Sequence, residues 1–344
     1  MTTVNESLRP SSLGEILDRT AQLYRSNFLL FAGVAAVPTG VLIAVFAAAG
    51  AMLAIVGVSA RGAVSPELLT GLLVVVIVLV GVPVGFAATV FSHAGLTRTA
   101  VCAHMGERLT IRAAFKSVRP RFWRYLGLMM LQGLFAGGIP AAAAGVLIAV
   151  LSFLESLAGG GSAIGILAGF LLFCVVAVTV VAVIMLALAC SMAMSVCVVE
   201  DKSAWESLNR AMKLSKGTRG RIFLMFLLVW ALSFVLSMMA YIPTLIIATT
   251  VTAMGHGAEY ATLTLIAAEI LNVLINFAIQ TLITPVYTTG LVLFYYDQRI
   301  RKEGFDIEWM MMQAGLTEAK AITGPDPAGI TAGRPAGPDT VKEL

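Results

Sequence analysis

The chain has 344 residues, of which 59% are hydrophobic and only 12% are charged, and its mean hydropathy is +0.92. A soluble domain needs far more polar surface than this composition supplies, so a soluble protein is excluded and an integral membrane protein is indicated. The net charge of +4 is small, which makes the placement of the charges more informative than their sum.

The N-terminal segment precedes any apolar run and carries charges of both signs, among them Glu6, Arg9, Asp18 and Arg25. A cleavable signal peptide begins with a short basic segment followed by a short apolar core, which is a different pattern. We therefore expect this segment to be retained in the mature protein.

Six long apolar runs follow, and each exceeds the about 20 residues that a helix needs to cross the hydrocarbon core of a bilayer. They cover residues 28–58, 68–96, 125–157, 164–199, 222–254 and 261–296. The runs are continuous, whereas the strands of a transmembrane barrel alternate in polarity over about ten residues. The sequence thus predicts an all-α, polytopic membrane protein with six transmembrane helices.

The basic residues are distributed very unevenly between the connections. Of the 23 Lys and Arg residues, only Arg61 falls in a connection after the first, third or fifth run. The others lie in the N-terminal segment, in the connections 98–124 and 200–221, or after the sixth run. Because loops rich in Lys and Arg stay on the cytoplasmic side, both long connections and both termini are predicted to be cytoplasmic.

Three segments of similar pattern each precede a pair of apolar runs. They read SLGEILDRTAQLYRSNF from Ser12, TIRAAFKSVRPRFWRYL from Thr110 and SAWESLNRAMKLSKGTR from Ser203. Glu15 and Arg19 of the first segment match Glu206 and Arg210 of the third without a gap. We interpret the chain as three parallel repeats of an amphipathic helix plus a transmembrane hairpin, which differs from the inverted repeat common in secondary transporters.

These repeats define the predicted domain organisation. A six-span membrane domain covers residues 1–315, with repeats at about 12–108, 110–201 and 203–312. The remaining residues, 316–344, are rich in Ala, Gly, Pro and Thr and are predicted to form a flexible cytoplasmic tail.

The amphipathic segments have local signals for helix formation. Ser12 with Glu15, and Ser203 with Glu206, fit the capping box that satisfies backbone N–H groups of a first helical turn. Apolar residues recur on one face of each helix. Such helices can lie in the interface with basic groups toward anionic headgroups, or they can pack on the span ends as caps, and the two readings are not exclusive.

A polar stripe runs along the sixth apolar run, and it is the best candidate for a functional surface. Its members, at steps of three, four and four, are Glu269, Asn272, Asn276 and Gln280. This spacing places them on one helix face, and ionisable groups inside spans usually face protein or water. The alternative interpretation is that the amides make hydrogen bonds between helices.

The sixth run ends in two tyrosines and a burst of charge. Aromatic rings suit the headgroup layer and basic groups follow where a helix leaves the bilayer, so we interpret the cluster as an interfacial anchor. Its members are Tyr295, Tyr296, Arg299, Arg301 and Lys302. No catalytic residues, metal site or cofactor are predicted, because the sequence lacks the motifs that such chemistry requires.

Three segments of the chain carry a resemblance to a known family. They read LRPSSLGEILDRTAQLYRSNFLLF, SAWESLNRAMKLSKG and LFYYDQRIRKEGFDIEWM. Over about residues 8–313 the chain resembles a bacterial family of multi-span proteins labelled the glycerophosphoryl diester phosphodiesterase membrane domain. The resemblance implies an integral protein of the bacterial inner membrane. In that family catalysis belongs to a separate soluble barrel of about 250 residues, and only about 30 residues follow Met312 here, so phosphodiesterase activity is not expected.

The leading hypothesis is a non-enzymatic scaffold or accessory protein of the inner membrane. Its basic cytoplasmic face would engage anionic lipid or a protein partner, including a second copy of the chain, and no nucleic acid is expected. The alternative is a transporter or lipid-handling protein whose polar cavity is lined by the sixth helix.

Overall fold

The structure is a computed structural model that describes residues 11–59, 66–107, 109–158, 163–253 and 258–304. Every regular element within these ranges is helical, and six helical segments there are long and apolar enough to cross a membrane. The prediction of an all-α, multi-pass membrane protein is therefore confirmed at this level. The predicted tail at 316–344 lies outside the described residues.

Most of the helices extend beyond the predicted apolar runs at the ends that carry the basic connections, whereas the run 164–199 is interrupted by a turn at residues 191–192. Their bounds are α1 (Leu13–Ser26), α2 (Phe28–Ser59), α3 (Pro66–Val76), η2 (Ile77–Gly81), α4 (Val82–His104), α5 (Ile111–Val118), η3 (Arg119–Arg121), α6 (Phe122–Gly133), η4 (Leu134–Gly138), α7 (Ile139–Ala158), α8 (Ala163–Cys190), α9 (Ala193–Glu200), α10 (Ala204–Leu214), α11 (Arg219–Ala253) and α12 (Ala258–Glu303).

Both predicted capping boxes are present. The backbone N–H of Ser12 donates to the Glu15 carboxylate at 2.8 Å, and the N–H of Glu15 donates to the Ser12 hydroxyl at 3.3 Å. Ser203 and Glu206 make the same reciprocal pair at the start of α10. Each box satisfies donors that a helix start otherwise leaves unpaired.

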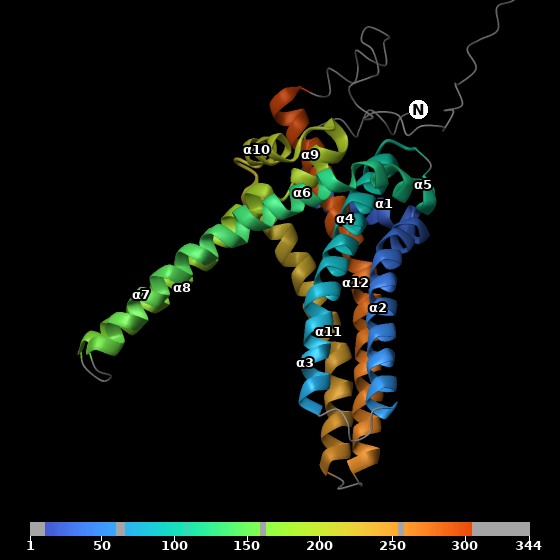
Figure 1. Cartoon of the computed structure of the whole chain (residues 1–344). Helices are drawn as coiled ribbons and strands as arrows, with labels where there is room; N and C mark the ends of the chain where they lie inside the picture. Colours follow the sequence, from blue (N-terminus) through green and yellow to red (C-terminus); the bar gives the residue numbers. More distant parts are fainter. Residues whose placement is uncertain (1–10, 60–65, 108, 159–162, 254–257, 305–344) are drawn as a thin grey trace, which may run out of the picture.

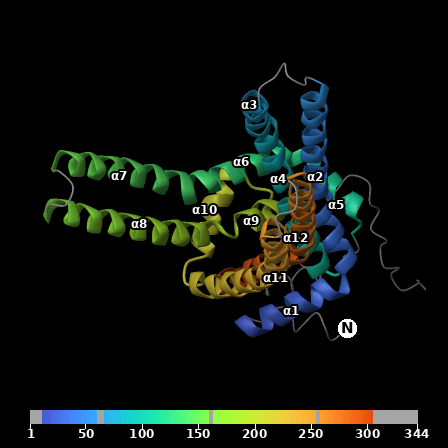
Figure 2. The ribbon, with the colours of Figure 1, turned by 90° about the horizontal axis from the view of Figure 1, so that it is seen from below.

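The long helices form two groups that diverge from a common end. In Figures 1 and 2, α2, α3, α4, α11 and α12 form one group, while the α7–α8 hairpin runs away from it. The most extensive packing is that of α2 along α4, α7 along α8 and α11 along α12, and α12 also packs against α2 and α4. The shorter helices α1, α5, α9 and α10 gather with α6 where the two groups meet, and we call this end of the molecule the cap.

The main hydrophobic core lies in the cap. Its fully buried large side chains include Phe31, Leu128, Met192, Leu208 and Phe294. A smaller cluster lies farther along the α11–α12 pair, and elsewhere the long helices expose many large apolar side chains. The tertiary fold is therefore held together mainly at one end, while the apolar remainder presents the surface that a spanning helix turns to lipid.

The amphipathic helices pack as caps on this core. Ile16 of α1, Ala114 and Val118 of α5, and Leu208 and Ala211 of α10 are all buried. Each of these helices precedes a pair of long helical segments, as the proposed unit requires. Their apolar faces contact protein, so they cap the ends of the spans, and this packing is compatible with charged faces that lie toward headgroups. That the three units are copies of one another stays a prediction.

Candidate functional site

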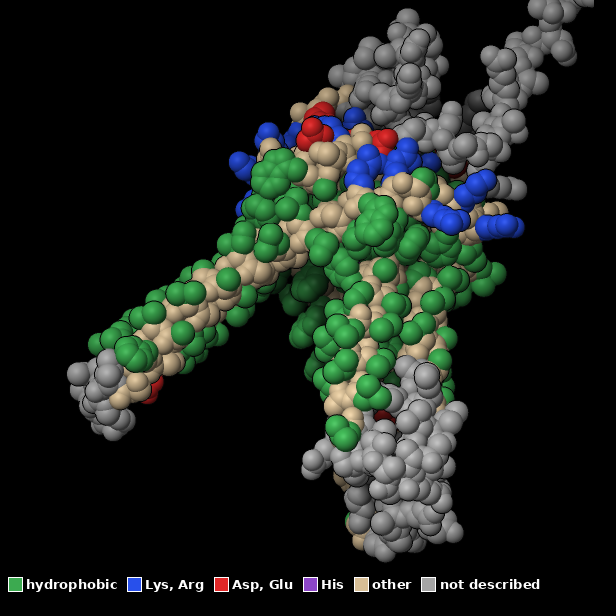
Figure 3. Space-filling model, in the orientation of Figure 1, with side chains coloured by type: hydrophobic (Ala, Val, Ile, Leu, Met, Phe, Trp, Pro, Cys, Tyr) green, Lys and Arg blue, Asp and Glu red, His purple; other side chains and the backbone are tan. Residues whose placement is uncertain are grey.

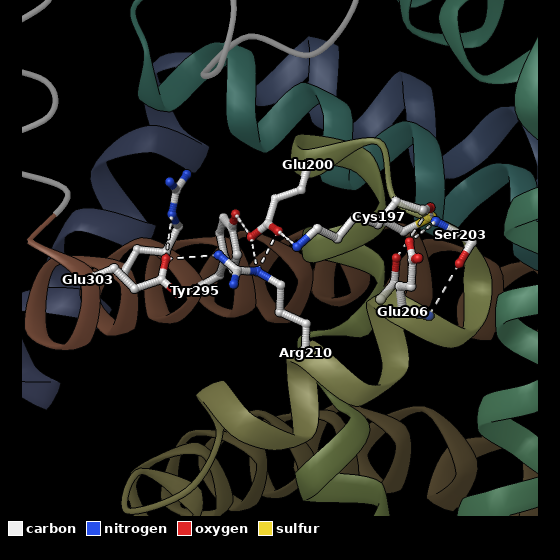
Figure 4. A network of polar contacts seen from close by, with 10 residues as sticks. Cys197, Glu200, Ser203, Glu206, Arg210, Tyr295 and Glu303 are labelled. Carbon is white, nitrogen blue, oxygen red and sulfur yellow. Dashed lines mark hydrogen bonds and ion pairs between the residues drawn. The ribbon is translucent and has the colours of Figure 1, made fainter.

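A network of charged side chains joins three helices of the cap, and Glu200 stands at its centre (Figure 4). Glu200 ends α9, and its side chain is only 11% exposed. Its carboxylate accepts hydrogen bonds from the Tyr295 hydroxyl at 2.9 Å and from Nε of Arg210 at 2.6 Å, and Nζ of Lys202 lies 2.9 Å from Oε2. The carboxylate is thus neutralised inside the protein, as burial of a charge requires.

Arg210 carries the network on to the end of α12. Its guanidinium donates to Oε2 of Glu303 at 2.9 Å, and Nε of Arg299 lies 3.3 Å from the same oxygen. The Arg299 guanidinium also lies over the ring of Tyr295, 6.0 Å from the ring centroid. Burial disfavours the charged form of Arg210, yet its hydrogen bond to Glu200 and the two nearby carboxylates raise its pKa above the usual value.

A second charged cluster surrounds Asp297, whose side chain is 3% exposed. Its carboxylate lies 3.3 Å from the guanidinium of Arg221 and 2.9 Å from Nε of Arg301, and it accepts from the backbone N–H of Ser11 at 2.8 Å. The Ser11 carbonyl accepts from the same two arginines at 2.6 and 2.8 Å. This cluster fastens the start of α1 to α11 and α12.

A third cluster lies in the turn between α9 and α10. Asp201 has a positive φ of 53°, and its carboxylate pairs with Arg121 at 3.0 Å and with Arg124. Arg124 also donates to the Asp201 carbonyl at 2.9 Å. The turn is thereby tied to the beginning of α6.

The predicted interfacial anchor requires a correction. Tyr295 and Tyr296 are 0% and 2% exposed, and Arg299 is 8% exposed, so these side chains lie inside the cap and do not face a headgroup layer. Arg301 and Lys302 are more exposed, but Arg301 pairs with Asp297 and Lys302 donates to backbone carbonyls of the cap. An aromatic and basic pattern at a helix end does not reveal whether lipid or protein surrounds it, because the partners come from distant segments.

Lys302 has a structural role that the sequence did not suggest. Its Nζ donates to the carbonyls of Leu214 at 2.8 Å, Lys216 at 2.7 Å and Lys213 at 3.3 Å. These carbonyls lie at the C-terminal end of α10, where a cation is favourable for the helix dipole. The end of α12 therefore closes the end of α10.

The polar stripe lies on α12 beyond the cap. Asn272 and Asn276 are half-buried, and the Asn276 amide donates to the carbonyl and the side-chain oxygen of Asn272 at 2.9 and 2.8 Å. Glu269 and Gln280 are exposed. The structure brings the two asparagines together on one helix, beside the face through which Ile279 packs toward α11.

One small pocket opens in the cap between α1, α4 and α12. Arg19, His104, Tyr296 and Asp297 are among the side chains that line it, and the His104 ring lies 5.0 Å from the ring of Tyr296. The polar stripe does not contribute to this pocket. Sequence reasoning missed it because its walls come from three segments that are far apart in the chain.

The buried acids of the cap thus hold helices together, each through at least two cationic partners. Among the described residues, no group of three His, Cys, Asp or Glu side chains is arranged to hold a metal ion. A comparison of the chain with known protein-family models, curated proteins and solved structures found no match.

Proposed function

We propose that this chain is a non-enzymatic, six-span scaffold or accessory protein of the bacterial inner membrane, and that its cap forms a basic cytoplasmic face that engages anionic lipid or a protein partner. One observation carries the proposal. The amphipathic helices turn their apolar faces to the core, so their charged faces form the outside of the cap.

The distribution of charge supports this reading. In Figure 3 the Lys and Arg side chains gather at the cap, while the long helices present hydrophobic side chains. Exposed cations of the three amphipathic segments are Arg25, Arg112, Lys116, Arg119, Lys213 and Lys216. A basic surface next to apolar spans attracts anionic headgroups and favours the cytoplasmic side.

The ion pairs made by the acidic residues of the cap support a role as a scaffold. Glu200, Asp201 and Asp297 are each held in ion pairs within the cap. They pair with partly exposed arginines and fix the relative positions of α1, α6, α10 and α12, and further exposed cations remain on the outer surface. We further propose that the three helix units are parallel repeats.

The family resemblance remains part of the proposal. The three quoted segments fall on α1, on α10 and on the end of α12, and α12 packs against both of the other helices. The described parts of these segments, residues 11–31, 203–217 and 293–304, therefore meet in the cap, which supports a shared structural unit.

Native mass spectrometry of the protein released gently from its own membrane tests the proposal. We expect retained anionic phospholipid or a protein subunit, and crosslinking in cells identifies the subunit. If reconstituted protein shows no preference for anionic lipid, and crosslinking captures no partner, the proposal is wrong.

The second candidate function is transport or lipid handling along the polar stripe of α12. The half-burial of Asn272 and Asn276 within an apolar helix favours it. A lipid or solute that is retained by the wild-type protein and lost from the Asn276→Ala/Gln280→Ala variant would support this function. If the folded variant retains the lipid or solute as well as the wild-type protein does, the polar stripe is not its binding site.

A further inference from the structure

The three amphipathic helices differ in the charges that they expose, and α5 is the distinctive one. The exposed polar residues of α1 include Glu15 and Asp18, and those of α10 include Glu206. The exposed charges of α5 and the following turn are all positive, namely Arg112, Lys116 and Arg119.

The exposed cations of α5 continue into an exposed aromatic ring. Arg112 and Lys116 are four positions apart and share one face of α5, Arg119 lies in the 3-10 turn η3 and Trp123 lies at the start of α6, and all four side chains are exposed. The Trp123 side chain is 78% exposed. We call these four residues the α5 stripe.

Within the residues that the structure describes, no ion pair joins a carboxylate to Arg112, Lys116 or Arg119. Asp201, in the turn between α9 and α10, pairs instead with Arg121 and Arg124. Between residues 108 and 154 the sequence contains no Asp or Glu. The neighbouring arginines are thus paired inward, while the stripe carries three positive charges on the surface.

The opposite face of α5 fixes the helix against two spans. A Cβ added to Gly33 of α2 would clash with Cδ1 of Ile111, and one added to Gly95 of α4 would lie 3.5 Å from the ring of Phe115. Phe122 stacks on Phe91 at 4.7 Å between ring centroids. Such close packing holds α5 beside the spans, with its cationic face turned outward.

We propose that the α5 stripe is the lipid-contacting surface of the cap, where Arg112, Lys116 and Arg119 bind the phosphate groups of anionic phospholipids and Trp123 lies in the bilayer interface. The inference rests on the proposed function and names the element that performs it. Charge complementarity selects the anionic headgroup, and the exposed indole at the entry to a span selects a bilayer surface over a soluble polyanion.

Quenching of Trp123 by brominated lipid tests the proposal. The full chain with Trp205→Phe, Trp230→Phe and Trp309→Phe retains Trp123 as its single tryptophan. It is reconstituted in phosphatidylcholine vesicles that contain a minor fraction of brominated phosphatidylglycerol, and in matched vesicles in which the same fraction of phosphatidylcholine is brominated. We expect stronger quenching by the brominated phosphatidylglycerol, and the difference should shrink in high salt.

Removing the cations gives the decisive comparison. Each cation near an anionic surface contributes about a fivefold preference for anionic lipid. In the Arg112→Gln/Lys116→Gln/Arg119→Gln variant, the preference for phosphatidylglycerol over phosphatidylcholine that the quenching reports should therefore fall by at least about tenfold. The matched control removes three exposed cations elsewhere, with Arg25→Gln, Lys213→Gln and Lys216→Gln, and should keep it. Equal elution and melting behaviour of both variants in detergent shows that each is folded.

The possible results separate this inference from the proposed function. If anionic lipid is retained in native mass spectrometry but selective quenching is absent, or survives removal of the α5 cations, the stripe is not the lipid site while the proposed function stands. If the α5 variant loses only a crosslinked acidic protein, the stripe binds a protein and the lipid assignment is overturned. If the wild-type protein retains neither anionic lipid nor a partner, both proposals fail.

Discussion

The hydroxyl of Tyr295 donates a hydrogen bond of 2.9 Å to the carboxylate of Glu200, across 95 positions of the chain. Both side chains lie inside the cap, where the Glu200 carboxylate also forms ion pairs with Arg210 and Lys202. This contact shows that the end of α12 is an internal clamp between helices, because its most conspicuous aromatic group binds a protein carboxylate.

Tyr295→Phe should destabilise the protein. The change removes one hydrogen bond to a charged group and leaves the ring in place, so we expect a loss of about 1.5 to 3 kcal/mol in the free energy of unfolding. Denaturant or thermal unfolding in detergent measures it. Tyr24→Phe is the matched control, because the Tyr24 hydroxyl has no hydrogen-bond partner among the described residues. Equal stability of the two variants would contradict the clamp.

Asp297→Asn should weaken the attachment of α1 to α11 and α12. The amide keeps the size of the side chain but removes the charge that Arg221 and Arg301 share. We expect a loss of about 2 to 4 kcal/mol, below the full cost of breaking a buried pair because the guanidinium groups are 30% and 37% exposed.

The pairing of Asp297 with Arg301 can be isolated with a double-mutant cycle. Arg301→Gln in the Asp297→Asn background should cost less than Arg301→Gln alone, since its partner is already gone. Purely additive losses would show that the two side chains do not interact.

Lys302→Gln should loosen the C-terminal end of α10. The substitution removes the cation that donates to the Leu214 and Lys216 carbonyls, and we expect faster hydrogen exchange in residues 213–218 and a loss of about 1 kcal/mol. Lys213→Gln removes an exposed cation from the same turn and serves as the control. Unchanged exchange in the Lys302 variant would show that the contact does not stabilise α10.

The asparagines of α12 should be coupled to each other. Because the Asn276 amide bonds to Asn272, replacing either by alanine should cost about 0.6 to 2 kcal/mol, and the second replacement should cost less than the first. Gln280→Ala, on an exposed position, provides the reference. Unfolding in detergent supplies the three values, and strict additivity would argue against a stabilising pair.

The orientation of the cap can be measured with cysteine labelling in intact cells. Three of the four native cysteines are buried and one is half-buried, which favours a low background. If the cap faces the cytoplasm as proposed, Lys216→Cys should react with a membrane-impermeant maleimide only after the membrane that holds the protein is permeabilised. Glu155→Cys, at the far end of α7, should react before that step. The reverse pattern would place the cap outside the cytoplasm.

Local patterns in the sequence were sufficient to predict the helical class, six helices that are long and apolar enough to cross a membrane, and the capping boxes of Ser12 and Ser203. Each depends on residues that are close in the chain, since a long apolar run specifies a spanning helix and a capping box needs two side chains three positions apart. The spacing also placed Asn272 and Asn276 on one helix face, where the structure shows them bonded to each other.

Only the tertiary structure decided what surrounds those elements. The apolar face of an amphipathic helix has the same sequence pattern against lipid as against protein, and so has the pair Tyr295 and Tyr296 at a helix end. Their burial depends on Glu200 and other partners that lie far away in the chain, as does the pairing of Asp297 with Ser11 over 286 positions. Hydrophobicity determines that these residues leave water, whereas long-range packing determines whether protein or lipid takes its place.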